Sequence, residues 1–307
     1  MTDLRTRLQG LWLPLVTPFR NNELDETSLR RLVVHYAALP VDGLVLAATT
    51  GESLTLTSGE TERLVFTVRD ETGRGRNLPL CLGLSGSNTR ALLETLARTA
   101  AWPIDAYLIS YYSRPSQRGL ELHFSALADH AEHPVMLYNI PYRTGVNLGN
   151  EAMLRLAGHR NIVGLKDCSA NRDQARDLLR RRPDDFAVLT GEDAQYHDAL
   201  VDGADGGILA SAHVETEIFA NVWKLHEAGD HNAALARWRS VEELVRLLFS
   251  EPSPAPIKHW LWRTGLIESA ELRLPMTEVS AELAARLDRE IERRTTAWKN
   301  ASLVNAR

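Results

Sequence analysis

Short apolar runs alternate with amphipathic stretches along most of the chain. The run 162–166 is typical, because it is rich in β-branched residues and too short for a helix, which predicts a strand buried on both faces. The stretch 25–39 has apolar residues at helical spacing, so it predicts a helix with one buried face. Thr57 and Glu60 have the form of a capping box, which predicts another helix over 58–72.

Strand–helix units of this kind follow one another eight times. The predicted strands span residues 11–16, 43–47, 78–84, 106–109, 135–138, 162–166, 186–189 and 206–209. The predicted helices span residues 25–39, 58–72, 89–100, 117–131, 150–157, 173–181, 193–201 and 217–228. Eight units favour a closed (β/α)8 TIM barrel over an open sheet. An open dinucleotide-binding sheet would need a glycine turn directly after a strand, whereas Gly73-Arg74-Gly75 precedes one.

The chain after residue 228 has a helical pattern. Helices are predicted over 231–249, 256–264 and 280–299, and residues 300–307 are predicted to fray. We therefore expect a barrel over residues 1–228 and a C-terminal helical region over 229–307, which covers one side of the barrel or joins subunits.

Composition and charge narrow the class of protein. The 307 residues, 44% hydrophobic and 24% charged, have the make-up of a soluble globular protein. The net charge of −5 argues against nucleic-acid binding, and acidic neighbours dilute the arginines of 176–182. Cys81 and Cys168 are too few for a disulfide framework, no signal peptide is recognised, and no apolar run approaches the roughly 20 residues of a membrane span. We expect a cytoplasmic protein without nucleic-acid or membrane partners.

Lys166 stands at the carboxyl end of a predicted strand. In a closed barrel, the segments after the strands form the rim where active sites are built. A dry rim favours the neutral amine, which can attack a ketone and form a Schiff base. The alternative is a lysine whose stem packs on the strand while its head reaches water.

The predicted rim is also rich in hydroxyl groups, notably in 48–53 and 110–115. Schiff-base chemistry on a 2-keto acid needs an amine, a proton shuttle and donors for the carboxylate. Tyr138 ends the strand before that of Lys166, so the two side chains can converge over the barrel mouth, unless Tyr138 is simply a buried tyrosine. Arg143 could clamp a carboxylate, unless it is an ordinary surface arginine.

Other chemistries find less support. His130 and His133 share helical spacing, but no carboxylate or cysteine completes a metal set and HExxH is absent, so no metal is predicted. The segment 83–87 misses the nucleophile-elbow pattern by its last glycine, which disfavours a serine hydrolase. Cys168 is expected to pack around the site and not to act as a nucleophile.

Several rim segments resemble the dihydrodipicolinate synthase family, the class I aldolases and lyases that include N-acetylneuraminate lyase. The likeness runs from about residue 11 to residue 277. Its markers are Thr49-Thr50-Gly51-Glu52-Ser53, Tyr111-Tyr112 with Arg114-Pro115-Ser116-Gln117, Tyr138-Asn139-Ile140-Pro141, Gly164-Leu165-Lys166-Asp167, Gly191-Glu192-Asp193 and Leu272-Arg273-Leu274-Pro275-Met276.

The resemblance implies a role for individual residues. Lys166 would form the imine, and the proton relay would consist of Tyr138, Thr49 and Tyr112, with Tyr112 reaching across a dimer interface. Substrate binding would fall to Thr50 for the pyruvate carboxylate, Arg143 for the carboxylate of the second substrate, and the backbone carbonyls of Gly191 and Ile208 for the pocket wall.

The implied reaction is condensation of pyruvate with aspartate 4-semialdehyde to 4-hydroxy-tetrahydrodipicolinate, in lysine biosynthesis. The family also implies a homotetramer of two tight dimers and no metal or nucleotide cofactor. Another pyruvate-dependent aldolase, lyase or dehydratase, acting on a keto sugar acid such as N-acetylneuraminate or a 2-keto-3-deoxy acid, is the alternative. Arg143 favours the synthase branch, because the sugar-acid lyases usually place something else there. A binding or sensing protein with a decayed site is a third possibility.

The chain departs from the family pattern at some positions. Ala48, Ser110 and the segment Cys168-Ser169-Ala170 replace more common residues of the family. Ser110 and Ala48 border the relay, which predicts a shifted substrate preference. The family's lysine-feedback site keeps Ser53, Asn88 and Tyr111, but other residues replace its small or polar contacts, including a glutamate that pairs the effector's amine. These replacements are Leu54, Ser58, Thr61 and Leu92. Because a buried ammonium without a partner binds poorly, we predict weak or absent inhibition by lysine.

Overall fold

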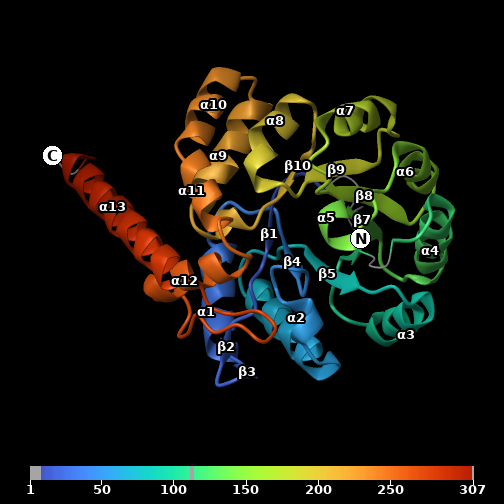
Figure 1. Ribbon diagram of the computed structural model, residues 1–307, viewed down its shortest axis with the longest axis horizontal. Coiled ribbons are helices and arrows are strands. Elements are labelled where there is room, and N and C mark those ends of the chain that lie inside the picture. Colours follow the sequence, from blue (N-terminus) through green and yellow to red (C-terminus); the bar gives the residue numbers. More distant parts are fainter. Residues whose placement is uncertain (1–7, 111–113, 306–307) are drawn as a thin grey trace.

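Eight parallel strands close into a barrel with helices around it (Figure 1). The structure is a computed structural model that describes residues 8–110 and 114–305. Around the barrel the strands follow the order β1-β10-β9-β8-β7-β6-β5-β4. They span β1 Gly10–Pro14, β4 Gly43–Leu46, β5 Leu80–Ser85, β6 Ala106–Ser110, β7 Val135–Asn139, β8 Ile162–Asp167, β9 Ala187–Thr190 and β10 Gly206–Ile208. The predicted (β/α)8 barrel is confirmed.

A helix follows each strand, as the periodicity predicts. These helices are α1 Glu26–Ala37, α2 Ser58–Gly73, α3 Thr89–Thr99, α4 Gln117–His130, α6 Asn150–Ala157, α7 Arg172–Arg181, α8 Tyr196–Val201 and α9 Thr216–Glu227. The capping box at α2 is present: the Thr57 backbone N–H donates to the Glu60 carboxylate at 2.9 Å, and the Glu60 N–H donates to the Thr57 hydroxyl at 3.2 Å.

Some short elements carry too little periodicity to be predicted. The hairpin β2 Phe19–Arg20 with β3 Glu23–Leu24 lies below the barrel in Figure 1. The one-turn helix α5 Pro141–Thr144 follows β7, and three 3₁₀ turns, η2 Ser53–Thr55, η3 Asp193–Gln195 and η4 Ser211–His213, follow the ends of β4, β9 and β10. These elements matter because they stand at the rim that the candidate site occupies.

The C-terminal region differs from its prediction in two places. It contains α10 His231–Arg239, α11 Glu242–Leu248, α12 Ala255–Arg263 and α13 Ala281–Asn305. The single helix predicted over 231–249 is wrong, because the Ser240 hydroxyl donates back to the Arg237 carbonyl at 2.7 Å and the chain turns to bury Val241. Fraying from residue 300 is also wrong: nothing between 281 and 305 is glycine or proline, and α13 continues to Asn305, projecting from the body in Figure 1.

Two apolar clusters fill the molecule. One lies inside the barrel and includes Trp12, Met136 and Leu189. The larger cluster lies between strands and helices and extends to Trp260 and Leu287, so the C-terminal helices share its core. Within residues 8–110 and 114–305, the helices include none that is long and apolar enough to cross a membrane.

Candidate active site

Lys166 lies at the mouth of the barrel, near the carboxyl end of β8. Its side chain is only 5% exposed, so it does not extend into solvent. The register of β7 with β8 pairs Tyr138 with Lys166, and the Lys166 Nζ atom lies 4.5 Å from the centroid of the Tyr138 ring. Two parallel neighbours thus bring the amine and the phenol together, as the sequence predicted.

Tyr138 is a buried phenol that stays protonated near neutrality. Burial raises its pKa well above the ordinary value, and the neighbouring Cys168 and Tyr142 add to the rise. A hydrogen bond with Thr49 acts in the opposite direction, so Thr49 is in contact with the phenol. Tyr138 therefore carries a proton that it can donate, and the Thr49 hydroxyl lies beside it, as the predicted proton relay requires.

A turn after β4 carries Thr49 and the buried Thr50. The Glu52 backbone N–H donates to the Thr49 carbonyl at 3.1 Å, and the Thr17 hydroxyl donates to the Gly51 carbonyl at 2.7 Å, which fixes the turn. Gly83 of β5 lets this turn approach closely, because a Cβ atom there would lie 2.5 Å from the Ala47 carbonyl oxygen.

Gly191 packs directly against the stem of Lys166. A Cβ atom at this position would lie 2.4 Å from Lys166 Cε and 2.3 Å from Cys168 Sγ. The Gly191 N–H donates to the Asp167 carbonyl at 2.7 Å, which fixes the distance between the two strand ends. Ile208, on β10, lies buried in the same interior cluster as Tyr138. Both predicted pocket-lining residues therefore lie around the mouth.

We expect Gly191→Ala to damage the site without unfolding the protein. The added methyl must displace the Lys166 side chain, and misplacing a reacting group by about 1 Å can cost roughly 10²-fold in rate, so kcat/KM should fall on that order. The matched control is Gly59→Ala on α2, where a Cβ atom has nothing within 4 Å. An unchanged kcat/KM in Gly191→Ala would show that the lysine is not held by this contact.

Arg143 lies on α5, beyond the phenol. Its guanidinium is exposed and lies 5.7 Å from the Tyr142 ring centroid. It hydrogen-bonds to the Tyr142 side chain, and an exposed guanidinium has further N–H donors with which to bind a carboxylate. Asn139 holds this region by donating to Asn147 at 2.9 Å and to Asp167 at 3.1 Å, which ties the segment after α5 to β8.

The remaining predicted positions are described only in part. Tyr112, predicted as the third relay residue, and Tyr111 lie outside the described residues. Among the departures from the family pattern, the Ser110 hydroxyl lies 2.8 Å from that of Ser85, and Ala48 belongs to the interior cluster. Burial raises the pKa of the Cys168 thiol, whose sulfur lies 4.0 Å from the Tyr138 hydroxyl, so it is a neutral packing group.

Two acidic residues at the mouth received no role from the sequence. Asp193 is buried and accepts a hydrogen bond from the Ser211 backbone N–H at 2.7 Å, while burial raises its pKa. Glu192 has its pKa raised to about 7, chiefly by burial and then by the charge of Asp193. The sequence did contain a signal for these two residues. They form a pair of carboxylates shortly after the predicted strand 186–189 and belong to the family marker Gly191-Glu192-Asp193.

A buried ion pair from the C-terminal region holds the Thr49–Thr50 turn. Lys258 of α12 donates to the Glu52 carboxylate at 2.5 Å and to the Glu271 carbonyl at 2.8 Å. The backbone N–H of Arg273 donates to the other Glu52 oxygen at 3.1 Å. Burial lowers the pKa of Lys258 to about 8 despite the attraction of Glu52. Sequence reasoning missed this pair, whose members are 206 positions apart.

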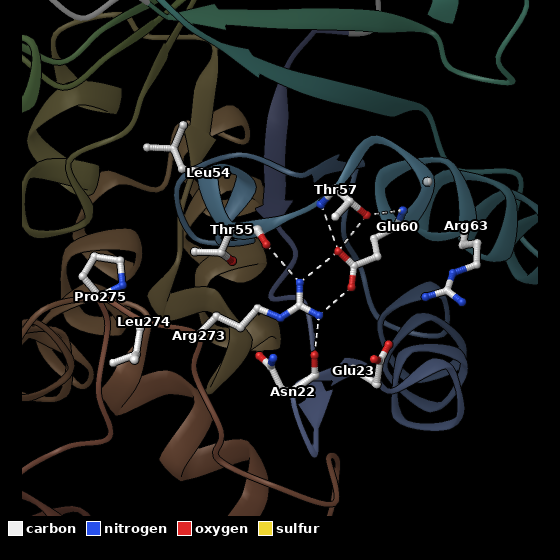
Figure 2. A pocket seen from close by; sticks show the side chains of 11 residues that line it. Asn22, Glu23, Leu54, Thr55, Thr57, Glu60, Arg63, Arg273, Leu274 and Pro275 are labelled. Carbon is white, nitrogen blue, oxygen red and sulfur yellow. Dashed lines mark hydrogen bonds and ion pairs between the residues drawn. The ribbon is translucent and has the colours of Figure 1, made fainter.

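Figure 2 shows the hydrogen bonds by which the Arg273 side chain binds the segment that follows the Thr49–Thr50 turn. The Arg273 guanidinium donates to the Thr55 carbonyl at 2.9 Å, to the Asn22 carbonyl at 2.6 Å and to the Glu60 carboxylate. The hydrogen bond from Arg273 lowers the pKa of the Glu60 carboxyl group to about 2. The residues border a cavity of about 1010 Å³ that is separate from Lys166. The turn, the hairpin and α2 are thus joined to the C-terminal segment.

The described ranges contain no group of three or more histidine, cysteine, aspartate or glutamate side chains that could hold a metal. His130 and His133 instead approach separate backbone carbonyls, those of Ala126 at 2.8 Å and Ala100 at 3.0 Å.

A buried lysine at the end of a barrel strand, packed on a phenol with a hydroxyl partner, is the arrangement of a Schiff-base aldolase. The model of the Dihydrodipicolinate synthetase family matches residues 7–294, and the chain belongs to this family. The family expectation from the sequence is therefore confirmed.

Individual relatives agree over nearly their full lengths. The chain is 39% identical to "4-hydroxy-tetrahydrodipicolinate synthase 2" of Clostridium acetobutylicum over 285 residues, which cover 92% of this chain and 99% of the relative. The crystal structure of dihydrodipicolinate synthase from Aquifex aeolicus matches with a TM-score of 0.90 at 30% identity, over 94% of this chain and 98% of that one. The chloride-inhibited enzyme from Acinetobacter baumannii, complexed with pyruvate, matches with a TM-score of 0.88 at 30% identity, over 93% of this chain and 98% of that one.

Proposed function

We propose that this chain condenses pyruvate with aspartate 4-semialdehyde to give 4-hydroxy-tetrahydrodipicolinate, through an imine on Lys166. The observation that carries the proposal is the position of the Lys166 amine, buried at the barrel mouth against Tyr138. The name of the Clostridium relative and the pyruvate bound to the Acinetobacter enzyme support the same reaction.

In the first half of the proposed reaction, the Lys166 amine loses its proton and attacks C2 of pyruvate. Thr50 holds the pyruvate carboxylate through its hydroxyl and backbone N–H. The Tyr138 phenol donates its proton to the carbinolamine hydroxyl, which leaves as water, and Thr49 and Tyr112 return a proton to Tyr138. The product is a protonated imine that draws electrons from C3.

In the second half, loss of a C3 proton gives an enamine. The enamine attacks the aldehyde carbon of the acceptor, a C–C bond forms, and the relay protonates the new alkoxide. Arg143 binds the acceptor's carboxylate, which fixes the distance between the aldehyde carbon and the enamine. The exposed guanidinium of Arg143, which Tyr142 contacts, favours this acceptor over the polyol tail of a sugar acid.

A panel of acceptors tests the proposed reaction. Purified protein is incubated with pyruvate and aspartate 4-semialdehyde, and separately with N-acetylneuraminate and 2-keto-3-deoxy acids in the cleavage direction. We expect turnover with the semialdehyde at a kcat/KM that exceeds those of the sugar acids. Cleavage of a sugar acid with no turnover of the semialdehyde would replace the proposed function by the alternative.

We also propose a homotetramer built from two tight dimers. Leu54 and Leu274 border the cavity of Figure 2 and are 73% and 82% exposed, which is unusual for large apolar side chains and fits a face that a second copy covers. Light scattering should give about four times the chain mass of 34.3 kDa. A monomeric mass at catalytic concentrations would contradict the tetramer.

The enzyme is proposed to work without a metal or nucleotide, in the cytoplasm. The protonated imine itself serves as the electron sink, so the reaction needs no Lewis acid. Dialysis against a chelator should leave kcat unchanged, and loss of kcat that added metal restores would contradict this proposal.

Lysine is expected to leave the rate almost unchanged. A cavity of about 200 Å³ lies beside the turn after β4, and its lining includes Ser53, Leu54 and Leu92 but no acidic residue. A lysine ammonium bound there would lose its water shell without gaining a carboxylate partner. Initial rates with millimolar lysine, at subsaturating pyruvate, measure the effect. Strong inhibition would show that another group pairs the amine.

A further inference from the structure

Glu192 occupies a fixed place at the mouth of the barrel. It directly follows Gly191, the residue that packs against the stem of Lys166. Its backbone N–H donates to the Thr190 hydroxyl at 3.2 Å, and its carbonyl accepts the Gln195 N–H at 2.9 Å. Both backbone groups are bonded, so the side chain projects from a rigid point.

The Glu192 carboxyl group lacks a partner on one side. Its Oε1 atom is buried and has no hydrogen-bond partner among residues 8–110 and 114–305, while the Cys168 thiol bonds to the carboxyl group. A buried acceptor without a donor costs free energy, and a donor that arrives with a substrate would recover that cost.

Charged and titratable groups from several elements surround this carboxyl group. They are Lys166 and Asp167 of β8, Cys168 after it, Asp193 of η3, and Tyr142 of α5 with Arg143 beside its ring. The positive charge of Lys166 favours the ionised form of Glu192 and so lowers its pKa. Once Lys166 has become a neutral enamine, the carboxylate loses this attraction.

The proposed acceptor supplies such a cation. Aspartate 4-semialdehyde carries an ammonium group on the carbon next to its carboxylate. With that carboxylate on Arg143 and the aldehyde carbon directed at the enamine on Lys166, the ammonium group lies in the space between them. Glu192 borders this space, because it follows Gly191, which contacts the Lys166 stem, and its carboxyl group bonds to the Cys168 thiol next to that stem.

We propose that Glu192 is a further catalytic residue, which binds the acceptor's ammonium group and removes a proton from it so that the amine closes the ring. The inference rests on the proposed function. After the proton moves to Glu192, the amine lone pair forms a bond to C2, and the C2=N π electrons move onto Lys166 Nζ. A proton then passes from the new ring nitrogen to Nζ. The C2–Nζ bond breaks and its electron pair stays on Nζ, which frees the lysine amine. The lone pair of the ring nitrogen forms the C2=N double bond, and this nitrogen releases its last proton.

The environment of Glu192 suits this role. A base works best when its pKa lies near the working pH, and that of Glu192 is raised to about 7 by burial and by Asp193. Because of this raised pKa, the Glu192 carboxyl group is protonated more often than an exposed carboxyl group would be. Protonation lowers the free-energy cost of burying an oxygen without a hydrogen-bond donor before the acceptor binds.

Two acceptors and one variant test the inference. Glu192→Gln keeps the size of the side chain but cannot take a proton. Succinate semialdehyde has the aldehyde and carboxylate of the proposed acceptor but no amine. Formation of the cyclic product from aspartate 4-semialdehyde should fall by about 10²-fold or more in Glu192→Gln, the usual scale for loss of a general base. Trapping of the pyruvate imine by borohydride, and condensation with succinate semialdehyde, should stay within about twofold of wild type.

Three further readouts complete the test. The wild-type rate should fall below about pH 7, and Glu192→Gln should lack this limb. Glu192→Asp should recover part of the rate, and Glu94→Gln, at an exposed position on α3, should equal wild type. Equal loss with both semialdehydes, or a wild-type rate and pH profile in Glu192→Gln, would overturn the inference. If the wild-type enzyme traps pyruvate but does not convert aspartate 4-semialdehyde, the proposed function itself fails, and the role of Glu192 fails with it.

Discussion

Lys166→Met is expected to abolish turnover while leaving the fold intact. Methionine fills the buried space of the lysine stem, so the protein loses the amine without gaining a cavity. Without the covalent intermediate, kcat should fall by roughly 10³-fold or more, the scale observed when a nucleophile is removed. The measurement is kcat with pyruvate and aspartate 4-semialdehyde, together with the melting temperature of the variant.

The chain offers a matched control for this variant. Lys224→Met removes an exposed lysine on α9 and should leave kcat and the melting temperature unchanged. A Lys166→Met protein that melts like wild type and retains a large share of its kcat would contradict the assignment of Lys166 as the imine-forming residue.

Lys258→Met should be the most destabilising substitution among those considered. It removes one member of a fully buried ion pair and leaves the Glu52 carboxylate inside the protein without its cation. Breaking such a pair typically lowers the free energy of unfolding by about 3–5 kcal/mol. Because Glu52 holds the turn that carries Thr49 and Thr50, the KM for pyruvate should rise as well. Denaturant unfolding and steady-state kinetics measure the two effects.

Two further variants separate the charge from the packing. The double variant Lys258→Met with Glu52→Gln removes both charges of this pair and should recover most of the lost stability. Arg246→Met breaks an exposed pair with Glu242 on α11 and should cost less than about 0.5 kcal/mol. A Lys258→Met protein as stable as Arg246→Met would contradict the role of the buried pair.

The barrel could be predicted because its signals are local. Each strand and each helix carries its own period, and eight repeats of one unit leave few ways to bury every apolar face. The pairing of Tyr138 with Lys166 followed from the same rule, since consecutive strands of a parallel barrel are neighbours in space. The break at Ser240 could not be predicted, because a buried turn at Val241 reflects the packing of the whole helical region.

The missed features depend on contacts between distant parts of the chain. Lys258 reads as an ordinary helical lysine until Glu52, 206 positions away, is placed beside it. Glu192 reads as a surface acid shortly after a strand, and only the surrounding groups bury its oxygen. Short elements such as α5 have too few residues for a period, although α5 positions Arg143. The sequence thus indicated which residues lie at the rim, but it did not indicate how deeply each side chain is buried or which groups it contacts.

Borohydride reduction in the presence of pyruvate, followed by peptide mass spectrometry, tests the central claim most directly. We expect one covalent pyruvate adduct per chain, on the peptide that contains Lys166, and no adduct in Lys166→Met. An adduct on Lys224, Lys258 or Lys299, or the absence of any adduct when pyruvate saturates the enzyme, would contradict it.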